Sequence, residues 1–238
     1  MLKLLLLLLP IITFSQDAVR VEYEVRQEFD RSNLNQTSAK MEEMLVNSEN
    51  LRSYYELFVN STNSNFVKIE RINNDQRRGT AFGLSSNVSS NIYKDFKSKE
   101  LYENSQMNPK LFIKDSIQTF PWVLSKEEST ILGYKVRKAT YTNPTQTVEA
   151  WYASDLPFRD GPSRFNGLPG LILKIKFKLP FVSDMDTNVS FTAIDVKPYT
   201  GKIELPNKSK KVTKEEYDKE MEKKSSKFSG IYSGVEKD

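Results

Sequence analysis

Two aspartates, Asp155 and Asp160, lie in the loop that follows Trp151 and Tyr152. Two carboxylates at a suitable separation could act as the acid and the base in glycoside hydrolysis. The chain contains no histidine and no cysteine, so imidazole- and thiol-dependent nucleophilic catalysis is excluded. Any enzymatic chemistry must therefore use carboxylates, lysine, tyrosine or serine. The sequence alone assigns no catalytic residue, and it favours a non-enzymatic role while leaving an enzyme open.

The residue types present also restrict the metal chemistry. Without thiolate or imidazole ligands, ordinary zinc and copper sites are excluded, which leaves a hard metal held by oxygens. Asp184, Asp186 and Asn188 repeat the opening of a calcium loop, D-x-D-x-N. However, Val189 stands where that loop requires glycine and Asp195 where it requires glutamate. We therefore expect a polar hairpin turn here, with no metal site and no cofactor.

Charges and residues of special backbone geometry are concentrated in the loop over residues 155–170. The candidate functional residues of this loop and of the strand before it are Trp151, Tyr152, Asp155, Arg159, Asp160, Arg164, Gly167, Pro169 and Gly170. In one interpretation the charges form a structural latch of ion pairs that fixes the loop, and in the other they form a ligand-binding site. We favour the latch, and Asp160 and Arg164 are the residues that test it.

The end of this loop predicts a turn and a strand. Pro169-Gly170 suits the central positions of a type II turn, in which Gly170 takes a positive φ. In the strand expected over 171–177, even-numbered residues would lie on one side and the mostly apolar odd-numbered residues on the other. This is the pattern of a half-buried strand.

The same stretch carries a family resemblance. Residues 167–172 spell GLPGLI, and residues 151–166 read WYASDLPFRDGPSRFN. Together with ILGYKVRKA at 131–139, they resemble the GLPGLI family of Gram-negative envelope proteins. Members often carry a cysteine where this chain has Val136, so no cysteine-based role applies at that position. The resemblance spans most of the mature chain and implies an envelope location, but the family is known mainly as uncharacterised.

The N-terminus has the features of an export signal. Lys3 precedes an apolar run, and Ser15-Gln16 follows it, which predicts a signal peptide over 1–16. The run is shorter than the roughly 20 residues that a spanning helix needs. A lipoprotein anchor is excluded because there is no cysteine, and no transmembrane segment is expected in the mature chain. We therefore expect a periplasmic or secreted protein.

The mature chain, 17–238, is expected to form a single GLPGLI-type domain, because β-rich domains often reach this length. The formal net charge is +4, with 35 basic and 31 acidic residues that alternate along the chain. Interleaved charges of this kind are typical of a solvated surface. No nucleic-acid partner is therefore expected.

Alternating apolar and polar residues predict an antiparallel sheet in most of this domain. Strands are expected at 18–29, 53–60, 65–72, 91–96, 99–104, 110–113, 131–142, 147–152, 171–177 and 188–196, with an extended piece at 120–124 and a long polar loop at 73–90. Short polar turns join most consecutive strands, which favours a meander.

Two helices are expected beside the sheet. Ser38 is a suitable N-cap for a short helix over 39–48. Thr213 and Glu216 fit a capping box at the start of a charged surface helix from 214 to about 227, leaning on the sheet. The fold class is therefore α+β, with a mainly antiparallel curved sheet and one or two packing helices. Its pattern is similar to the half-barrel of periplasmic lipoprotein carriers.

These observations define two functional hypotheses. The leading one is a non-enzymatic envelope protein that binds a partner protein or an apolar ligand. The alternative is a carboxylate-dependent hydrolase of envelope or glycan substrates that uses Asp155, Asp160 or their neighbours. In addition, Asp115-Ser116-Ile117 is similar to an O-glycosylation motif of some Gram-negative envelope proteins, which makes Ser116 a candidate modification site.

Overall fold

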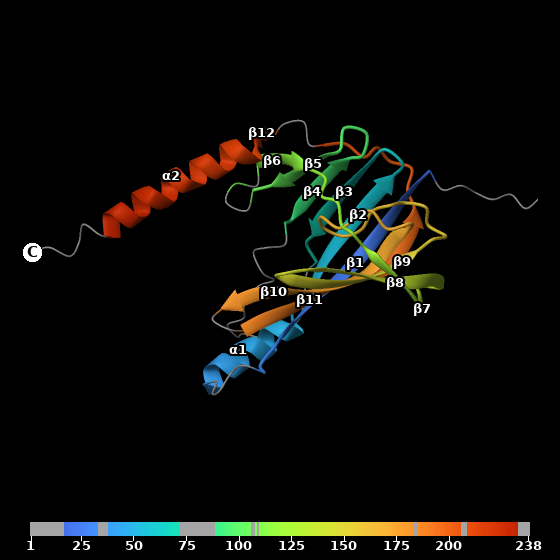
Figure 1. Cartoon of the computed structure of the whole chain (residues 1–238), viewed down its shortest axis with the longest axis horizontal. Coiled ribbons are helices and arrows are strands. Elements are labelled where there is room, and N and C mark those ends of the chain that lie inside the picture. Colours follow the sequence, from blue (N-terminus) through green and yellow to red (C-terminus); the bar gives the residue numbers. More distant parts are fainter. Residues whose placement is uncertain are drawn as a thin grey trace, which may run out of the picture.

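A computed structural model of the chain describes residues 17–32, 38–71, 89–105, 108, 110–182, 185–205 and 209–232. Within these residues, twelve strands form one mainly antiparallel sheet accompanied by two helices (Figure 1). The sheet is open, since its first and last strands are not paired with each other. The predicted α+β class is confirmed.

The first half of the chain contributes β1 (Ala18–Phe29), α1 (Ala39–Asn50), β2 (Ser53–Asn60), β3 (Asn63–Ile69), β4 (Asn91–Asp95), β5 (Glu100–Asn104) and β6 (Leu111–Ser116). The second half contributes β7 (Val123–Ile131), β8 (Tyr134–Asn143), β9 (Gln146–Ala153), β10 (Leu171–Val182), β11 (Met185–Pro198), β12 (Lys210–Thr213) and α2 (Lys214–Tyr232). Most predicted elements are present within a few residues of the expected bounds.

The strand order is β12-β6-β5-β4-β3-β2-β1-β11-β10-β9-β8-β7. Each half of the chain is therefore a meander, as predicted, and the two meanders join where β1 pairs with β11. The described strands pair antiparallel except β12 and β6, which are parallel. β1, the first strand of the chain, therefore lies near the middle of the sheet, and the second meander pairs with it through β11.

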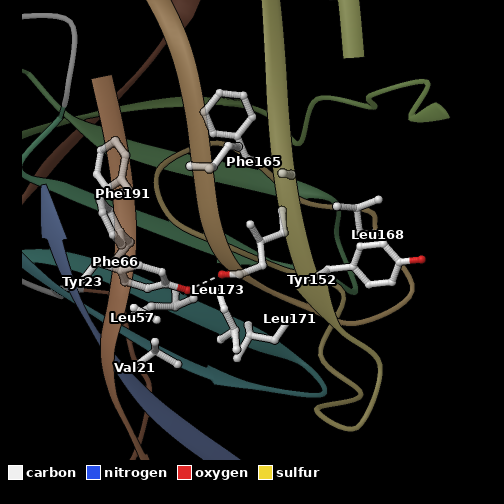
Figure 2. Packing of buried hydrophobic residues seen from close by; sticks show 14 of the residues in the cluster. Val21, Tyr23, Leu57, Phe66, Tyr152, Phe165, Leu168, Leu171, Leu173 and Phe191 are labelled. Carbon is white, nitrogen blue, oxygen red and sulfur yellow. Dashed lines mark hydrogen bonds between the residues drawn. The ribbon is translucent and has the colours of Figure 1, made fainter. Parts of the chain in front are cut away.

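The core lies where the two meanders meet. Tyr55 and Phe66 stack with ring centroids 4.8 Å apart, and the Phe191 ring lies 5.8 Å from that of Tyr55. Tyr23 of β1 is fully buried, and its hydroxyl donates a 2.6 Å hydrogen bond to the carbonyl of Ile172 (Figure 2). This bond satisfies the polar end of a large buried side chain and links β1 to the start of β10.

Both helix starts follow their predicted caps. The Ser38 hydroxyl accepts a hydrogen bond from the Met41 amide at 3.2 Å. Glu216 Oε2 accepts from the Thr213 amide at 2.9 Å, which completes a capping box. However, α2 does not lean on the sheet along its length, because it extends away from β6 and β12 (Figure 1).

One strand, β7, differs most from expectation. The predicted strand 131–142 is wrong at its start, because Leu132 and Gly133 both have positive φ, 53° and 81°. This is the signature of a type I′ hairpin turn. The turn ends β7 at Ile131 and begins β8 at Tyr134. β7 is mostly exposed and lies at the sheet edge, so its residues show no apolar alternation.

The hairpin between β2 and β3 is tighter than expected. Asn60 Oδ1 accepts hydrogen bonds from the amides of Thr62 and Asn63, both at 2.8 Å. The turn therefore spans only residues 61–62, and β3 starts at Asn63 instead of at residue 65.

Several predictions fall outside the described residues. These include the signal peptide at 1–16, most of the loop at 73–90, and Asp184 of the partial calcium loop. Asp186 lies in β11, 3.7 Å from the Lys178 ammonium. Among the residues that the structure describes, no acidic cluster could hold a metal ion and no helix is long and apolar enough to cross a membrane.

Candidate functional site

The loop between β9 and β10, residues 154–170, is held by its own backbone. Asp160 and Asn166 form an isolated β-bridge, and the Gly167 amide donates to the carbonyl of Arg159 at 2.9 Å. The amides of Leu171 and Ile172 donate to the carbonyls of Leu156 and Asp160, each at 3.0 Å. These bonds fold the loop back over the start of β10.

Apolar side chains anchor the loop to the sheet. Leu156, Phe158, Phe165 and Leu168 are all buried and belong to the main core cluster. Figure 2 draws Phe165 and Leu168 among the buried residues of the strands. Phe165 contacts the ring of Phe120 at a centroid distance of 5.3 Å. The loop is therefore a structured part of the core.

Gly170 is required at the end of this loop for two reasons, the predicted positive φ and a close backbone approach that was not predicted. The type II turn at Pro169-Gly170 is wrong, because Gly170 has a φ of 158° instead of the value near +80° that this turn needs. A Cβ at Gly170 would lie 2.2 Å from the carbonyl oxygen of Ala153. The backbones approach too closely there for any side chain. Gly167 also has a positive φ, of 93°.

Gly161 allows the loop to cover Ile172. A Cβ at Gly161 would lie 2.7 Å from the Cβ of Ile172, and both residues are buried. The expected half-buried pattern is therefore wrong at the start of β10, where Leu171, Ile172 and Leu173 are all fully buried. The strand alternates further on, since Ile175 is buried and Lys176 is exposed.

The charge of Asp160 is paired outside the loop. Its Oδ1 lies 2.6 Å from Nζ of Lys94 on β4, and both side chains are fully buried. Lys94 Nζ also donates to the carbonyl of Phe165 at 3.3 Å. Burial lowers the pKa of Lys94, and the adjacent charge of Asp160 opposes that shift. The pair therefore connects the loop to the first meander through the protein interior.

Arg164 forms a second connection to the first meander. Its guanidinium contacts Glu103 of β5 and lies 3.5 Å from Asp115 of β6. Asp160 and Arg164 therefore have different partners, on β4 in one case and on β5 and β6 in the other. The ion pairs therefore join the loop to strands that are distant in the sequence. Sequence patterns did not identify Lys94 or Glu103 as partners, because both have the appearance of ordinary polar strand residues.

The two candidate catalytic carboxylates have different environments. Asp155 is exposed in the turn after β9, and Asp160 is fully buried. Asp155 borders a small depression of about 110 Å³ together with Glu128 and Arg137. Asp160 does not line it. The structure therefore does not bring these carboxylates together in one open cleft.

The remaining candidates lie on strands around the loop. Tyr152 is buried in the core, and Trp151 is partly buried with the Lys138 ammonium 5.8 Å from its ring centroid. Pro169 is exposed. Ser116 is exposed at the end of β6, and its amide donates to Asp115 at 2.7 Å.

An open pocket of about 720 Å³ lies beside the loop. Five short segments line it, and their residues are Asn60, Ser61, Phe96, Lys99, Ile117, Gln118, Thr119, Phe120, Pro157, Phe158, Arg159, Asn166 and Gly167. Of the predicted candidates, only Arg159 and Gly167 are among them. The other lining residues come from turns and connections that are far apart in the sequence, so no local sequence pattern indicates that they meet.

The pocket wall is fixed by hydrogen bonds between its segments. Asn166 Nδ2 donates to the carbonyl of Gln118 at 3.1 Å, and its carbonyl accepts from the Trp122 indole at 2.8 Å. Arg159 donates to the carbonyl of Gly167 at 2.9 Å. The connection from β6 to β7 is therefore held against the loop, and these bonds fix the wall of the pocket.

Comparisons with known proteins give a family match and a fold match. A family described as "Protein of unknown function (Porph_ging)" matches residues 143–174, which include β9, the loop and the start of β10. No curated protein matches the chain.

The fold resembles solved structures of PNGF-II. The structure in the P21 space group has 20% sequence identity and a TM-score of 0.54, and the match covers 85% of this chain and 32% of that chain. The structure in the C2 space group has 21% identity and a TM-score of 0.47, with 82% and 31% of the two chains covered. The chain thus spans about a third of the length of these structures. At this level of identity, the similarity concerns the fold alone.

Proposed function

We propose that this protein is an exported envelope protein of the GLPGLI family that binds a small, largely apolar ligand without catalysing a reaction. The observation that carries the proposal is the pocket of about 720 Å³ beside the 154–170 loop. Its volume lies within the roughly 300–1,000 Å³ range of ligand pockets, and such pockets are lined mainly by apolar side chains.

The position of the pocket supports this proposal. Pro157, Phe158, Arg159, Asn166 and Gly167 of its lining lie within the segment that matches the family. This segment also contains the GLPGLI sequence that supports the finer family name. The features at 1–16 support export to the periplasm or beyond it.

The burial of Asp160 favours binding over hydrolysis. An acid/base pair must reach the substrate, and a fully buried carboxylate that is paired with Lys94 cannot do so. Asp155 is exposed but does not line the main pocket. Asp160 instead contributes to the structure of the loop.

A neutral fluorescent probe tests the binding function. N-phenyl-1-naphthylamine should increase in fluorescence when it enters the pocket of the purified protein. Thr119 is exposed and lines the pocket, so Thr119→Trp should obstruct part of the pocket and weaken the increase. Thr130→Trp, at an exposed position on the β7 edge, is the matched control and should bind the probe normally. Equal binding by both variants would overturn the proposal.

A further inference from the structure

The charged residues of the pocket lining are both cationic. Lys99 and Arg159 belong to it, and it contains no aspartate or glutamate. The two side chains come from different segments, since Lys99 precedes β5 and Arg159 lies in the 154–170 loop.

Arg159 also differs from the other arginines. Within the described part of the chain, the other arginines each have a carboxylate oxygen within 4.0 Å, as Arg31 does with Glu49 and Arg164 does with Glu103. Arg159 has no such partner there, and its hydrogen bond goes to the neutral carbonyl of Gly167. This bond orients the guanidinium at the pocket but does not neutralise it.

Lys99 is held at the pocket by its backbone. It has a positive φ of 58°, and its carbonyl accepts a 2.9 Å hydrogen bond from the Ile117 amide. The preceding turn is fixed by Asp95 Oδ1, which accepts from the amides of Lys97 and Ser98. Like Arg159, Lys99 has no ion-pair partner among the residues that the structure describes. Both cations therefore remain available for an anion.

We propose that the ligand of this pocket is an amphiphilic anion, with its carboxylate, sulfonate or similar group bound by Arg159 and Lys99. Its apolar body would contact Phe96, Phe120 and Phe158, which lie in the same lining. Arginine suits such a group because its planar guanidinium can donate two parallel hydrogen bonds to one anion. This inference rests on the binding function proposed above, and it adds the charge of the ligand.

A pair of matched probes separates the two proposals. 8-Anilinonaphthalene-1-sulfonate and N-phenyl-1-naphthylamine share the same aromatic body, but only the first carries an anionic group. In fluorescence titrations at low salt, Arg159→Gln and Lys99→Gln should each weaken sulfonate binding about tenfold, which corresponds to about 1.4 kcal/mol. The same variants should change the affinity for the neutral probe much less, so that the loss is selective for the anionic group. Arg159→Lys should bind the sulfonate with an affinity between those of the wild type and Arg159→Gln, because it keeps the charge but loses the parallel pair of hydrogen bonds.

The control is Lys97→Gln, which removes an exposed lysine in the same turn that does not line the pocket. It should leave both affinities unchanged. If the neutral probe binds but Arg159→Gln does not weaken the sulfonate selectively, the anionic ligand is refuted and the pocket function stands. If neither probe binds, or if Thr119→Trp binds both like the wild type, both proposals fail.

Discussion

Lys94 and Asp160 form an ion pair of 2.6 Å in which both side chains are fully buried. The pair connects β4 to the loop that precedes β10, so it spans the two meanders of the sheet. The second carboxylate oxygen of Asp160 is buried without a hydrogen-bond partner among the described residues. Since such pairs are costly to desolvate, we infer that this one specifies the position of the loop more than it stabilises the fold.

Removing one partner of this pair should destabilise the protein strongly. Lys94→Met or Asp160→Leu should each lower the free energy of unfolding by about 3–5 kcal/mol, because the remaining group stays buried without its partner. Lys94→Met combined with Asp160→Leu should recover most of this loss. Denaturant unfolding measures all three values. Additive losses in the double variant would contradict the pairing.

Arg164 should contribute less than Asp160. Its pairs with Glu103 and Asp115 are partly exposed, so Arg164→Gln should lower the free energy of unfolding by about 1 kcal/mol. A double-mutant cycle with Glu103→Gln should show coupling, whereas a cycle with Asp160→Asn should show little. Stronger coupling to Asp160 than to Glu103 would mean that the two charges act as one pair within the loop.

Gly170 and Gly133 allow a matched test of backbone approach. Gly170→Ala places a methyl group against the Ala153 carbonyl and should cost about 3 kcal/mol. Gly133 has a positive φ, but nothing lies within 4 Å of a Cβ added there. Gly133→Ala should therefore lower the free energy of unfolding by only about 1–2 kcal/mol, through backbone strain. Equal losses in thermal or denaturant unfolding would remove close approach as the reason for Gly170.

Tyr23 should make the protein sensitive to alkali. Burial raises the pKa of Tyr23 well above 10, and the charge of Asp160 adds to this shift. The unfolded chain loses the phenol proton near pH 10, while the folded protein keeps it. The contribution of Tyr23 is therefore complete below pH 10 and is lost as the pH rises above it.

Tyr23→Phe tests this pH dependence. At pH 8 the variant should be about 1–3 kcal/mol less stable, because the Ile172 carbonyl loses its hydrogen bond. Between pH 9 and pH 11, the difference from the wild type should shrink, since only the wild type has this phenol to titrate. Unfolding curves with a constant difference over that range would show that Tyr23 does not titrate as argued.

The sequence predicted those elements whose determinants are local. Ser38 and Thr213 mark helix starts because a cap acts within one turn, and β1 was correct in both bounds because its alternation reports a buried face. Only the start of β7 was predicted, in the extended piece at 120–124, because an exposed edge strand needs no apolar alternation. The pairing of β1 with β11 depends on contacts across most of the chain, which local patterns do not encode.

The candidate site was predicted only in part, because its loop has local sequence signals whereas the partners of the loop depend on contacts across the chain. The loop was recognised from its glycines, prolines and charges, but the partners of those charges were not. Lysine is rarely buried in proteins, and only the tertiary fold shows that Lys94 is fully buried against Asp160. Lys99, Phe96 and Phe120 contribute to the pocket from turns and connections whose meeting depends on the sheet order.

The predicted export can be examined directly. N-terminal sequencing of the protein from the envelope fraction of its native host should begin near Gln16, because the features of residues 1–16 match a cleaved signal peptide. Intact Met1 in protein recovered from the cytoplasm would contradict this prediction.

Native mass spectrometry of the protein purified from its native envelope fraction tests the central claim most directly. The wild type and Thr130→Trp should each carry a noncovalent ligand, which is released on denaturation and is detected as an amphiphilic anion. Thr119→Trp should carry less of it, because the added indole obstructs part of the pocket. A wild-type protein without added mass, or a ligand retained equally by Thr119→Trp, would contradict a binding function for this pocket.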